Sequence, residues 1–113
     1  MAQNHVKPKL DISVVIPLYN EEDNVDLLHK ALDDVLSKMP EKYEIIFIDD
    51  GSSDNTFAKM RMLAQKDPNL KLIKFRNNCG QSAATDAGFE MARGKTIIVM
   101  DGDLQNDPRD IPK

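Results

Sequence analysis

Cysteine and histidine are scarce in this sequence: its 113 residues include one cysteine, Cys79, and two histidines, His5 and His29. A single cysteine excludes an internal disulfide and suits a reducing compartment. Two histidines are too few for a histidine-rich metal site, and no zinc-ligand spacing, Ser-His-Asp set or Cys-His set can be assembled. A Walker-type phosphate loop is also missing. Any chemistry must therefore rest on other residue types.

An excess of basic residues and a long apolar run are absent as well. The formal net charge is −4, so the chain has no basic footprint for nucleic acid, and we expect no nucleic-acid partner. No apolar run approaches the ~18 residues of a membrane span. Residues 1–9 are polar and lack the apolar region of a signal peptide. We therefore expect one soluble domain, residues 1–113, in the cytoplasm.

Apolar, β-branched runs alternate with helical patterns along the chain. Strands are expected at residues 12–18, 44–48, 70–75 and 96–100, and helices at residues 20–39, 54–66 and 81–93. This alternation predicts βαβ units with parallel strands. Asn20 and Asp54 are expected to cap the first two helices, and Gly88 should let the third helix pack closely. Asp107 and Pro108 resemble the start of another helix, so we expect residues 1–113 to be the N-terminal part of a longer protein.

Polar residues follow each expected strand. An open parallel sheet binds its ligand beyond the carboxyl ends of its strands. The residues at these four ends are Pro17, Tyr19, Asn20 and Glu21; Asp49 and Asp50; Arg76 and Asn77; and Asp101 and Asp103. Solubility alone is a poor explanation for such a collection, so we expect a binding site at this edge.

Asp101, Gly102 and Asp103 follow a run that we expect to be a buried strand. Residues two apart on a strand point to the same side, so both carboxylates can converge on one ligand. Gly102 lets the backbone bend and a ligand approach. Carboxylates, water and a substrate phosphate are typical ligands of Mg²⁺, and Gln105 offers a further oxygen. We interpret the segment as a cation and diphosphate site; the alternative is a solvated acidic turn.

The second strand is followed by two adjacent carboxylates. Asp49 and Asp50 face opposite ways, so at most one reaches the ligand, and we choose Asp50 as the acceptor for a ring N–H of uracil or guanine. The alternative is a structural turn. Tyr19 offers a flat face to a base, although packing is its commoner role, and Glu21 has the alternative of a helix-dipole contact. Arg76 suits a phosphate or a surface ion pair equally.

Four segments in order, residues 13–22, 48–54, 80–84 and 100–108, resemble the family 2 inverting glycosyltransferases. Within that family the chain is most similar to the polyprenyl-phosphate branch, the dolichol-phosphate mannosyltransferase type. Apart from this resemblance, the start of the third helix, residues 80–82, is interpreted as a plain helix N-terminus and not as an anion-binding site. The resemblance runs from about Leu10 to the last residue. It implies an α/β, Rossmann-like A-type glycosyltransferase fold, with a parallel sheet core and helices on both faces, truncated after the Asp-x-Asp motif.

The resemblance also implies the partners and the site. The donor would be a UDP- or GDP-sugar, and the cofactor would be Mg²⁺ or Mn²⁺. The acceptor would be a polyprenyl phosphate, either undecaprenyl or dolichyl phosphate. The protein would reach it at the cytoplasmic face of a membrane through a C-terminal part that these residues do not include. By the same resemblance, the base and ribose pocket is lined by Pro17, Tyr19, Glu21 and Asp50. The sugar nucleotide is held by Asp101, Gly102 and Asp103, and the metal by Asp103 and Gln105. The catalytic residues are Asp101 and Asp103.

An ionised phosphate acceptor can attack the anomeric carbon without a protein base, while the metal stabilises the departing diphosphate. In this family the acceptor half follows the Asp-x-Asp motif, so we expect residues 1–113 alone to transfer little or no sugar. The alternatives are a receiver-like phospho-acceptor domain, which needs a lysine after a later strand and a fifth strand, and a nucleotidyltransferase, which usually has a glycine-rich loop after the first strand. A non-enzymatic scaffold leaves the acids unexplained.

Overall fold

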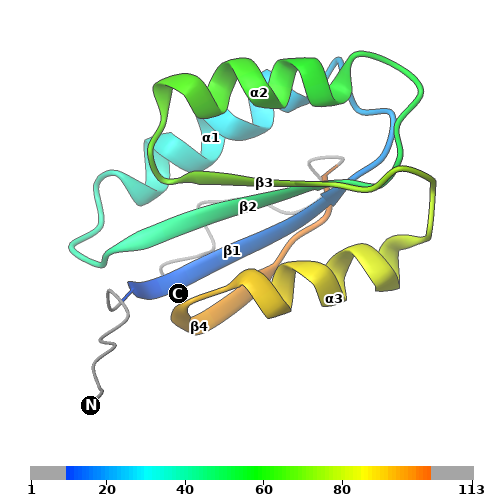
Figure 1. Cartoon of the computed structure of the whole chain (residues 1–113). Helices are drawn as coiled ribbons and strands as arrows, with labels where there is room; N and C mark the ends of the chain where they lie inside the picture. The colour runs from blue at the N-terminus through cyan, green and yellow to red at the C-terminus, as the bar shows by residue number, and fades with distance from the viewer. Residues whose placement is uncertain (1–9, 103–113) are drawn as a thin grey trace.

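Strands and helices alternate along the chain as the sequence predicts (Figure 1). The computed structural model describes residues 10–102, so Asp103, Gln105 and the helix start expected at Asp107 and Pro108 lie outside the described residues. The elements are β1 (Leu10–Leu18), α1 (Val25–Leu36), β2 (Tyr43–Asp49), α2 (Thr56–Lys66), β3 (Leu70–Lys74), α3 (Gln81–Met91) and β4 (Gly94–Val99). Within residues 10–102, no helix has both the length and the apolar composition needed to cross a membrane.

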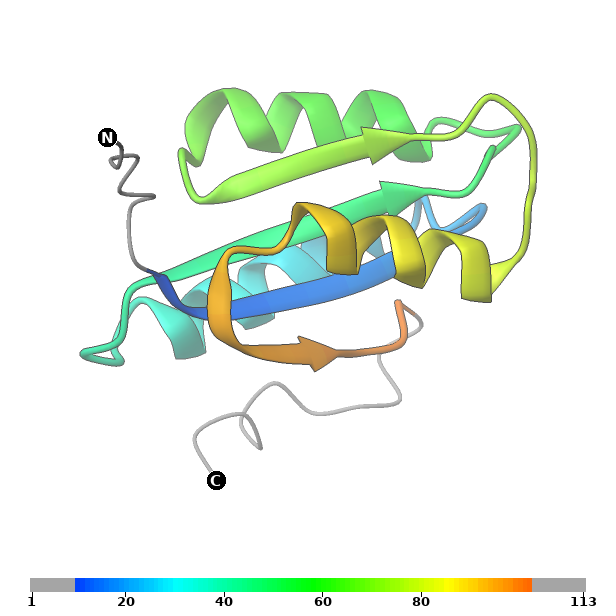
Figure 2. The same cartoon turned by 60° about the horizontal axis from the view of Figure 1, so that its bottom comes forward.

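The four strands form one parallel sheet in the order β3-β2-β1-β4. β1 therefore lies inside the sheet, with Val15 aligned to Ile46 of β2 and to Val99 of β4. Because all strands run the same way, their carboxyl ends lie at one edge, and the loops that follow them meet there (Figures 1 and 2). The predicted parallel sheet is confirmed.

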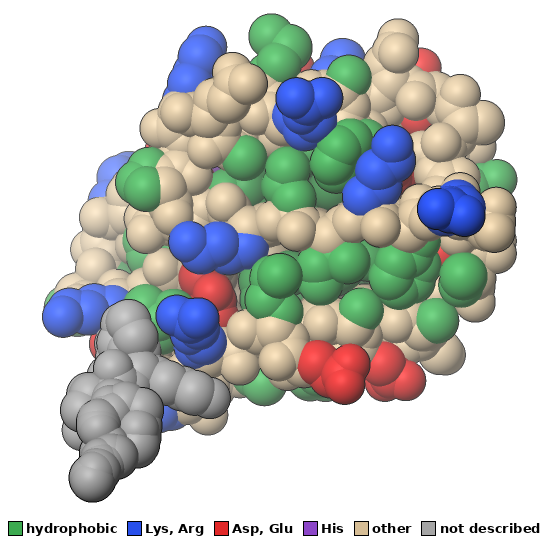
Figure 3. All heavy atoms as spheres, in the orientation of Figure 1, with side chains coloured by type: hydrophobic (Ala, Val, Ile, Leu, Met, Phe, Trp, Pro, Cys, Tyr) green, Lys and Arg blue, Asp and Glu red, His purple; other side chains and the backbone are tan. Residues whose placement is uncertain are grey.

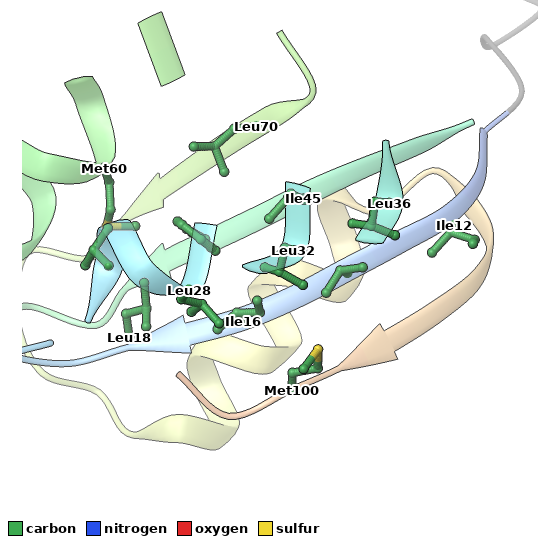
Figure 4. Packing of buried hydrophobic residues seen from close by; sticks show 13 residues of the cluster. Ile12, Ile16, Leu18, Leu28, Leu32, Leu36, Ile45, Met60, Leu70 and Met100 are labelled. Atoms are coloured by element: carbon green, nitrogen blue, oxygen red, sulfur yellow. The ribbon is translucent and has the colours of Figure 1, made fainter. Parts of the chain in front are cut away.

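Helices cover both faces of the sheet. α1 and α2 lie on one face and α3 on the other (Figure 2). Alternate residues of β1 serve the two layers: Val14 and Ile16 pack in the cluster with α1 and α2, whereas Val15 packs against α3. Figure 4 shows the first cluster, in which side chains of α1 lie over β1 and β2. The β-branched runs at residues 12–18 and 44–48 are buried on both faces, as predicted.

α3 packs on the sheet through its smallest residues. Gly88 and Ala84 are buried against it, and a Cβ added at Gly88 would lie 2.3 Å from Cγ1 of Val15 and 3.0 Å from Cδ1 of Ile48. Both neighbours are fully buried core side chains, so the helix has no free space to accept a methyl group. The close packing expected from Gly88 is confirmed.

Two expectations about individual elements are wrong. The first helix begins at Val25 rather than after Asn20, since Asn20 has a left-handed φ of 52° and Asn24 holds the N-cap position. β4 is not buried: Ile97 and Val99 are 36% and 40% exposed. In the described part of the chain β4 is an edge strand, and α3 packs over β1 and β2 beside it, so one face and one edge of β4 face solvent.

We predict that Gly88→Ala lowers the free energy of unfolding by about 1–3 kcal/mol, because overpacking the α3 interface outweighs the gain in helix propensity. Urea denaturation measures the difference. The matched control is Ser82→Ala, an exposed position of the same helix, which we expect to change stability by less than about 0.5 kcal/mol. A Gly88→Ala protein as stable as the wild type would contradict the packing described here.

Candidate functional site

A pocket of about 240 Å³ opens at the carboxyl ends of the strands. Its lining comes from the ends of β1, β2 and β4 and from the first residue of α3. The lining residues are Pro17, Leu18, Tyr19, Glu21, Asp50, Gln81, Asp101 and Gly102. Six of the expected site residues thus share one cavity, while the remaining two, Asp103 and Gln105, lie outside the described residues.

Asp50 is 3% exposed and makes three hydrogen bonds to the loop between β3 and α3. The N–H of Cys79 donates to Oδ1 over 2.7 Å, and the N–H of Gly80 and the amide of Asn78 donate to Oδ2 over 3.0 and 3.1 Å. A carboxylate oxygen has two acceptor positions, and among the described residues Oδ1 accepts one hydrogen bond, that of Cys79. Asp50 therefore organises this loop and still borders the pocket.

Asp49 has a different environment from its neighbour. It is 1% exposed, and its Oδ1 accepts the N–H of Ser52 over 3.1 Å, within the turn that follows β2. It does not line the pocket. Asp50 thus borders the pocket and Asp49 closes the turn after β2; the ligand role chosen for Asp50 stays a prediction.

Asp101 lies at the end of β4 and is half-buried. The side-chain amide of Gln81 donates to its Oδ1 over 3.2 Å, which joins α3 to the end of β4. The next residue, Gly102, packs on β1: a Cβ there would lie 2.1 Å from Cδ2 of Leu18 and 3.1 Å from the carbonyl oxygen of Pro17. Glycine is thus needed at Gly102 for contact with the protein itself, in addition to the ligand approach that we expected.

The loop after β1 is held by the turn after β2. In the loop after β1, the N–H of Asn20 donates to Oγ of Ser52 over 2.8 Å, and the side-chain oxygen of Asn20 accepts the N–H of Ser53 over 2.8 Å. The N–H of Glu21 donates to Oγ1 of Thr56 over 2.9 Å. These bonds stabilise the left-handed conformation of Asn20, which asparagine tolerates better than most residues. The helix-cap role expected for Asn20 is replaced by this link between two loops.

Tyr19 and Glu21 project from that anchored loop. Tyr19 is 47% exposed and lines the pocket, so its ring is accessible to a planar ligand and is not a core side chain. Glu21 accepts a hydrogen bond from the Asn24 amide over 2.8 Å, which fixes its carboxylate beside the first turn of α1. Arg76 is exposed and does not line the pocket; within residues 10–102 it forms no ion pair with Asp49 or Asp50.

Asp54 stabilises the start of α2, close to the capping role that we expected. Its carboxylate accepts the N–H and the hydroxyl of Thr56 and the N–H of Glu22. Burial raises the pKa of Asp54, but the hydrogen bonds from Thr56 and Glu22 favour the charged form more strongly, so its pKa lies below the ordinary value of 3.8. The assigned N-cap residue, Asn55, makes no side-chain capping bond of its own.

A larger hollow, of about 940 Å³, lies away from the strand ends. It is a groove between the carboxyl-terminal part of α3, the starts of β1 and β2, and β3, with Ile73 and Met91 among its apolar side chains. Figure 3 shows hydrophobic side chains between β3 and α3, with lysine and arginine side chains around them. At one end of the groove, burial raises the pKa of Tyr43. The groove lacks the convergent strand-end residues of the smaller pocket, which is therefore the candidate site.

In the described range, no three His, Cys, Asp or Glu side chains are arranged to hold a metal ion by themselves. Mg²⁺ and similar ions are commonly held by one or two carboxylates together with substrate phosphates. Asp101 fits that pattern because only its Oδ1 accepts a hydrogen bond from another described side chain. The convergence of Asp101 with Asp103 and the role of Gln105 as a metal ligand stay predictions.

Comparison with known proteins gives consistent results. The model of the family described as Glycosyl transferase family 2 matches residues 13–113. A dodecaprenyl-phosphate galacturonate synthase of Rhizobium johnstonii is 41% identical over 91% of this chain and 31% of its own length. An undecaprenyl-phosphate 4-deoxy-4-formamido-L-arabinose transferase of Pseudomonas fluorescens is 40% identical over 90% of this chain and 30% of its own length. The chain thus spans about 30% of these relatives.

Solved structures share the fold. The S. aureus TarS fragment 1-349 in complex with UDP-GlcNAc is 26% identical, with a TM-score of 0.70 over 83% of this chain and 27% of that one. The mannosyltransferase PcManGT of Pyrobaculum calidifontis, in complex with GDP-Man and Mn²⁺, is 24% identical, with a TM-score of 0.72 over 91% of this chain and 30% of that one. The A-type glycosyltransferase fold expected from the sequence is confirmed.

The depressed pKa of Asp54 predicts a pH-dependent contribution to stability. A group with a lowered folded-state pKa stabilises the fold above its unfolded pKa and loses this effect as the pH falls through the folded value. We therefore expect Asp54→Asn to be less stable than the wild type at pH 7, and the difference to shrink as the pH falls below about 3.8. Urea denaturation at several pH values measures it. Asp23→Asn, on the exposed β1–α1 loop, is the control; a pH-independent difference for Asp54→Asn would contradict the assignment.

Proposed function

Since this chain belongs to glycosyltransferase family 2, we propose that it is the nucleotide-sugar-binding, N-terminal part of a polyprenyl-phosphate glycosyltransferase. The observation that carries the proposal is the pocket in which Tyr19, Asp50 and Asp101 meet from three separate strand ends. Family membership also weighs against the receiver-like domain, the nucleotidyltransferase and the scaffold as alternatives.

The proposed donor is a UDP- or GDP-sugar. Relatives in fold bind such donors: TarS is in complex with UDP-GlcNAc and PcManGT with GDP-Man. In this chain the exposed ring of Tyr19 would stack on the base, and the second acceptor position of Asp50 Oδ1 would take a ring N–H, a group that uracil and guanine both offer. Pro17 and Glu21 would border the base and the ribose from the end of β1.

A divalent cation, Mg²⁺ or Mn²⁺, would stabilise the negative charge of the departing diphosphate. Asp103 and Gln105 would hold this cation, as the resemblance implies, and Asp101 would contribute from the pocket wall. Asp101 suits the task because its contact is a neutral amide, that of Gln81, and not a competing cation. The Mn²⁺ in the PcManGT complex supports a metal-dependent donor site.

The proposed acceptor is a polyprenyl phosphate, supported by the names of the two relatives, which act with dodecaprenyl phosphate and undecaprenyl phosphate. An acceptor phosphate is already ionised near neutral pH, so inversion at the anomeric carbon needs no protein base in these residues. Because the acceptor is a lipid, we propose that the longer protein acts at the cytoplasmic face of a membrane. Residues 1–113 alone would bind the donor and transfer little or no sugar.

Calorimetric titration with UDP and with GDP, each with and without Mn²⁺, tests the donor site. We expect the wild-type chain to bind one of the two nucleotides, more tightly with Mn²⁺ than without it, because the cation bridges carboxylate and diphosphate. Asp103→Ala should remove the effect of Mn²⁺, reducing affinity in its presence by about tenfold or more.

The matched control for that titration is Asp86→Asn, an exposed carboxylate of α3 outside the pocket, which should leave both affinities unchanged. Equal affinity with and without Mn²⁺ would contradict the metal-dependent site. Phosphorylation of Asp50 or Asp101 by a small phosphodonor, without any nucleotide binding, would favour a signalling domain instead.

A further inference from the structure

Gln81 lines the pocket, but no motif-based argument gives its side chain a role. It is the first residue of α3, and its amide nitrogen lies 3.2 Å from Oδ1 of Asp101, twenty residues further along the chain. A long, exposed glutamine at a helix start has several accessible rotamers, so a bond to a carboxylate in the pocket wall selects one of them. The contact therefore acts on the orientation of both side chains.

The backbone of Gln81 is itself held in place. Asp50 accepts the N–H groups of Cys79 and Gly80, the two residues before α3, and the carbonyl of Gly80 accepts the N–H of Ala84 in the first turn of the helix. Gly80 has a φ of 100°, in the left-handed region that favours glycine. Hydrogen bonds thus hold residues 79–80 to Asp50, directly before Gln81 in the chain, and the Gln81 side chain bonds Asp101.

The donor type at this position matters for charge. A glutamine amide is neutral, so it donates to Oδ1 of Asp101 without placing a positive charge beside the carboxylate. A lysine or arginine in the same place would form an ion pair and weaken the attraction of Asp101 for a cation. In the part of the chain that the structure describes, Oδ2 of Asp101 accepts no hydrogen bond from a side chain and is available to another partner.

We propose that Gln81 is a positioning residue that fixes the Asp101 carboxylate through Oδ1 and leaves its charge and Oδ2 for the cation and the sugar nucleotide. This inference rests on the proposed donor function. Gln81 acts through Asp101 and not on the reacting atoms, so its loss should weaken the cooperation between metal and nucleotide more than it weakens nucleotide binding alone.

The test compares nucleotide affinity with and without Mn²⁺ in the wild type and in Gln81→Met. Methionine has nearly the same length and no donor, so the helix start should be preserved. We expect the enhancement of UDP or GDP affinity by Mn²⁺ to fall about fivefold, the metal-free affinity to fall by clearly less, and the melting temperature to stay unchanged. Gln81→Lys, which keeps a donor but adds a positive charge, should lower the enhancement as well. Ser82→Ala, the neighbouring exposed residue, is the control.

The outcomes separate the two proposals. If the wild type shows a Mn²⁺ enhancement and Gln81→Met keeps it, the positioning role is overturned while the donor site stands. If Gln81→Met loses stability and metal-free affinity to the same extent as the enhancement, the residue is merely structural and the inference is overturned too. If the wild type binds neither UDP nor GDP, the proposed function itself fails, and the inference with it.

Discussion

The carboxylate of Asp50 accepts hydrogen bonds from three consecutive residues, Asn78, Cys79 and Gly80, and the shape of the pocket depends on them. A buried charge is costly unless it is hydrogen-bonded, so the loop before α3 cannot leave the end of β2 without a large penalty. The backbones also touch: a Cβ at Gly51, where φ is 72°, would lie 2.3 Å from the carbonyl carbon of Asn77. One carboxylate and one glycine thus join β2 to α3 at the ligand edge.

The opposite end of the sheet contains another buried carboxylate, that of Glu44, which helps to determine where β4 begins. Glu44, 3% exposed, accepts the hydroxyl of Ser13 over 2.6 Å and the N–H of Arg93 over 2.7 Å, and Oγ of Ser13 accepts the N–H of Gly94 over 2.8 Å. β1, β2 and the turn before β4 are therefore connected through one side chain. Because β4 starts at a fixed position on β1, Asp101 arrives at a fixed position in the pocket, where Gln81 contacts it.

Local patterns predicted the features that depend on neighbours in sequence. The β-branched runs predicted the two buried strands, β1 and β2, since burial on both faces selects such residues, and the alternation of strands and helices predicted a parallel sheet. Asn20 was misread because an asparagine before three acidic residues resembles a helix cap, whereas its actual partners, Ser52 and Ser53, are more than thirty residues away. The exposure of β4 was missed for a related reason: burial depends on which elements lie beside a strand.

The pocket residues likewise divide into those that the sequence pattern predicted and those that depend on contacts between distant elements. Tyr19, Asp50 and Asp101 could be predicted to meet, because strand ends of a parallel sheet converge. The role of Gln81 could not be predicted, because its hydrogen-bond partner, Asp101, lies twenty residues away on another element. The close packing of Leu18 against Gly102 follows from the pairing of β1 with β4, which the sequence does not specify. Asp103 and Gln105, outside the described residues, stay predictions from the motif.

Amide hydrogen exchange at residues 78–81 tests most directly whether Asp50 holds the pocket together. Asp50→Asn replaces an acceptor oxygen with an amide donor facing N–H groups, so we expect exchange at Cys79 and Gly80 to accelerate by about tenfold or more. Asp49→Asn, a change in the buried neighbour whose carboxylate accepts the N–H of Ser52 in its own turn, should leave these amides protected. Equal protection of Cys79 and Gly80 in the wild type and in Asp50→Asn would contradict the central role given to this carboxylate.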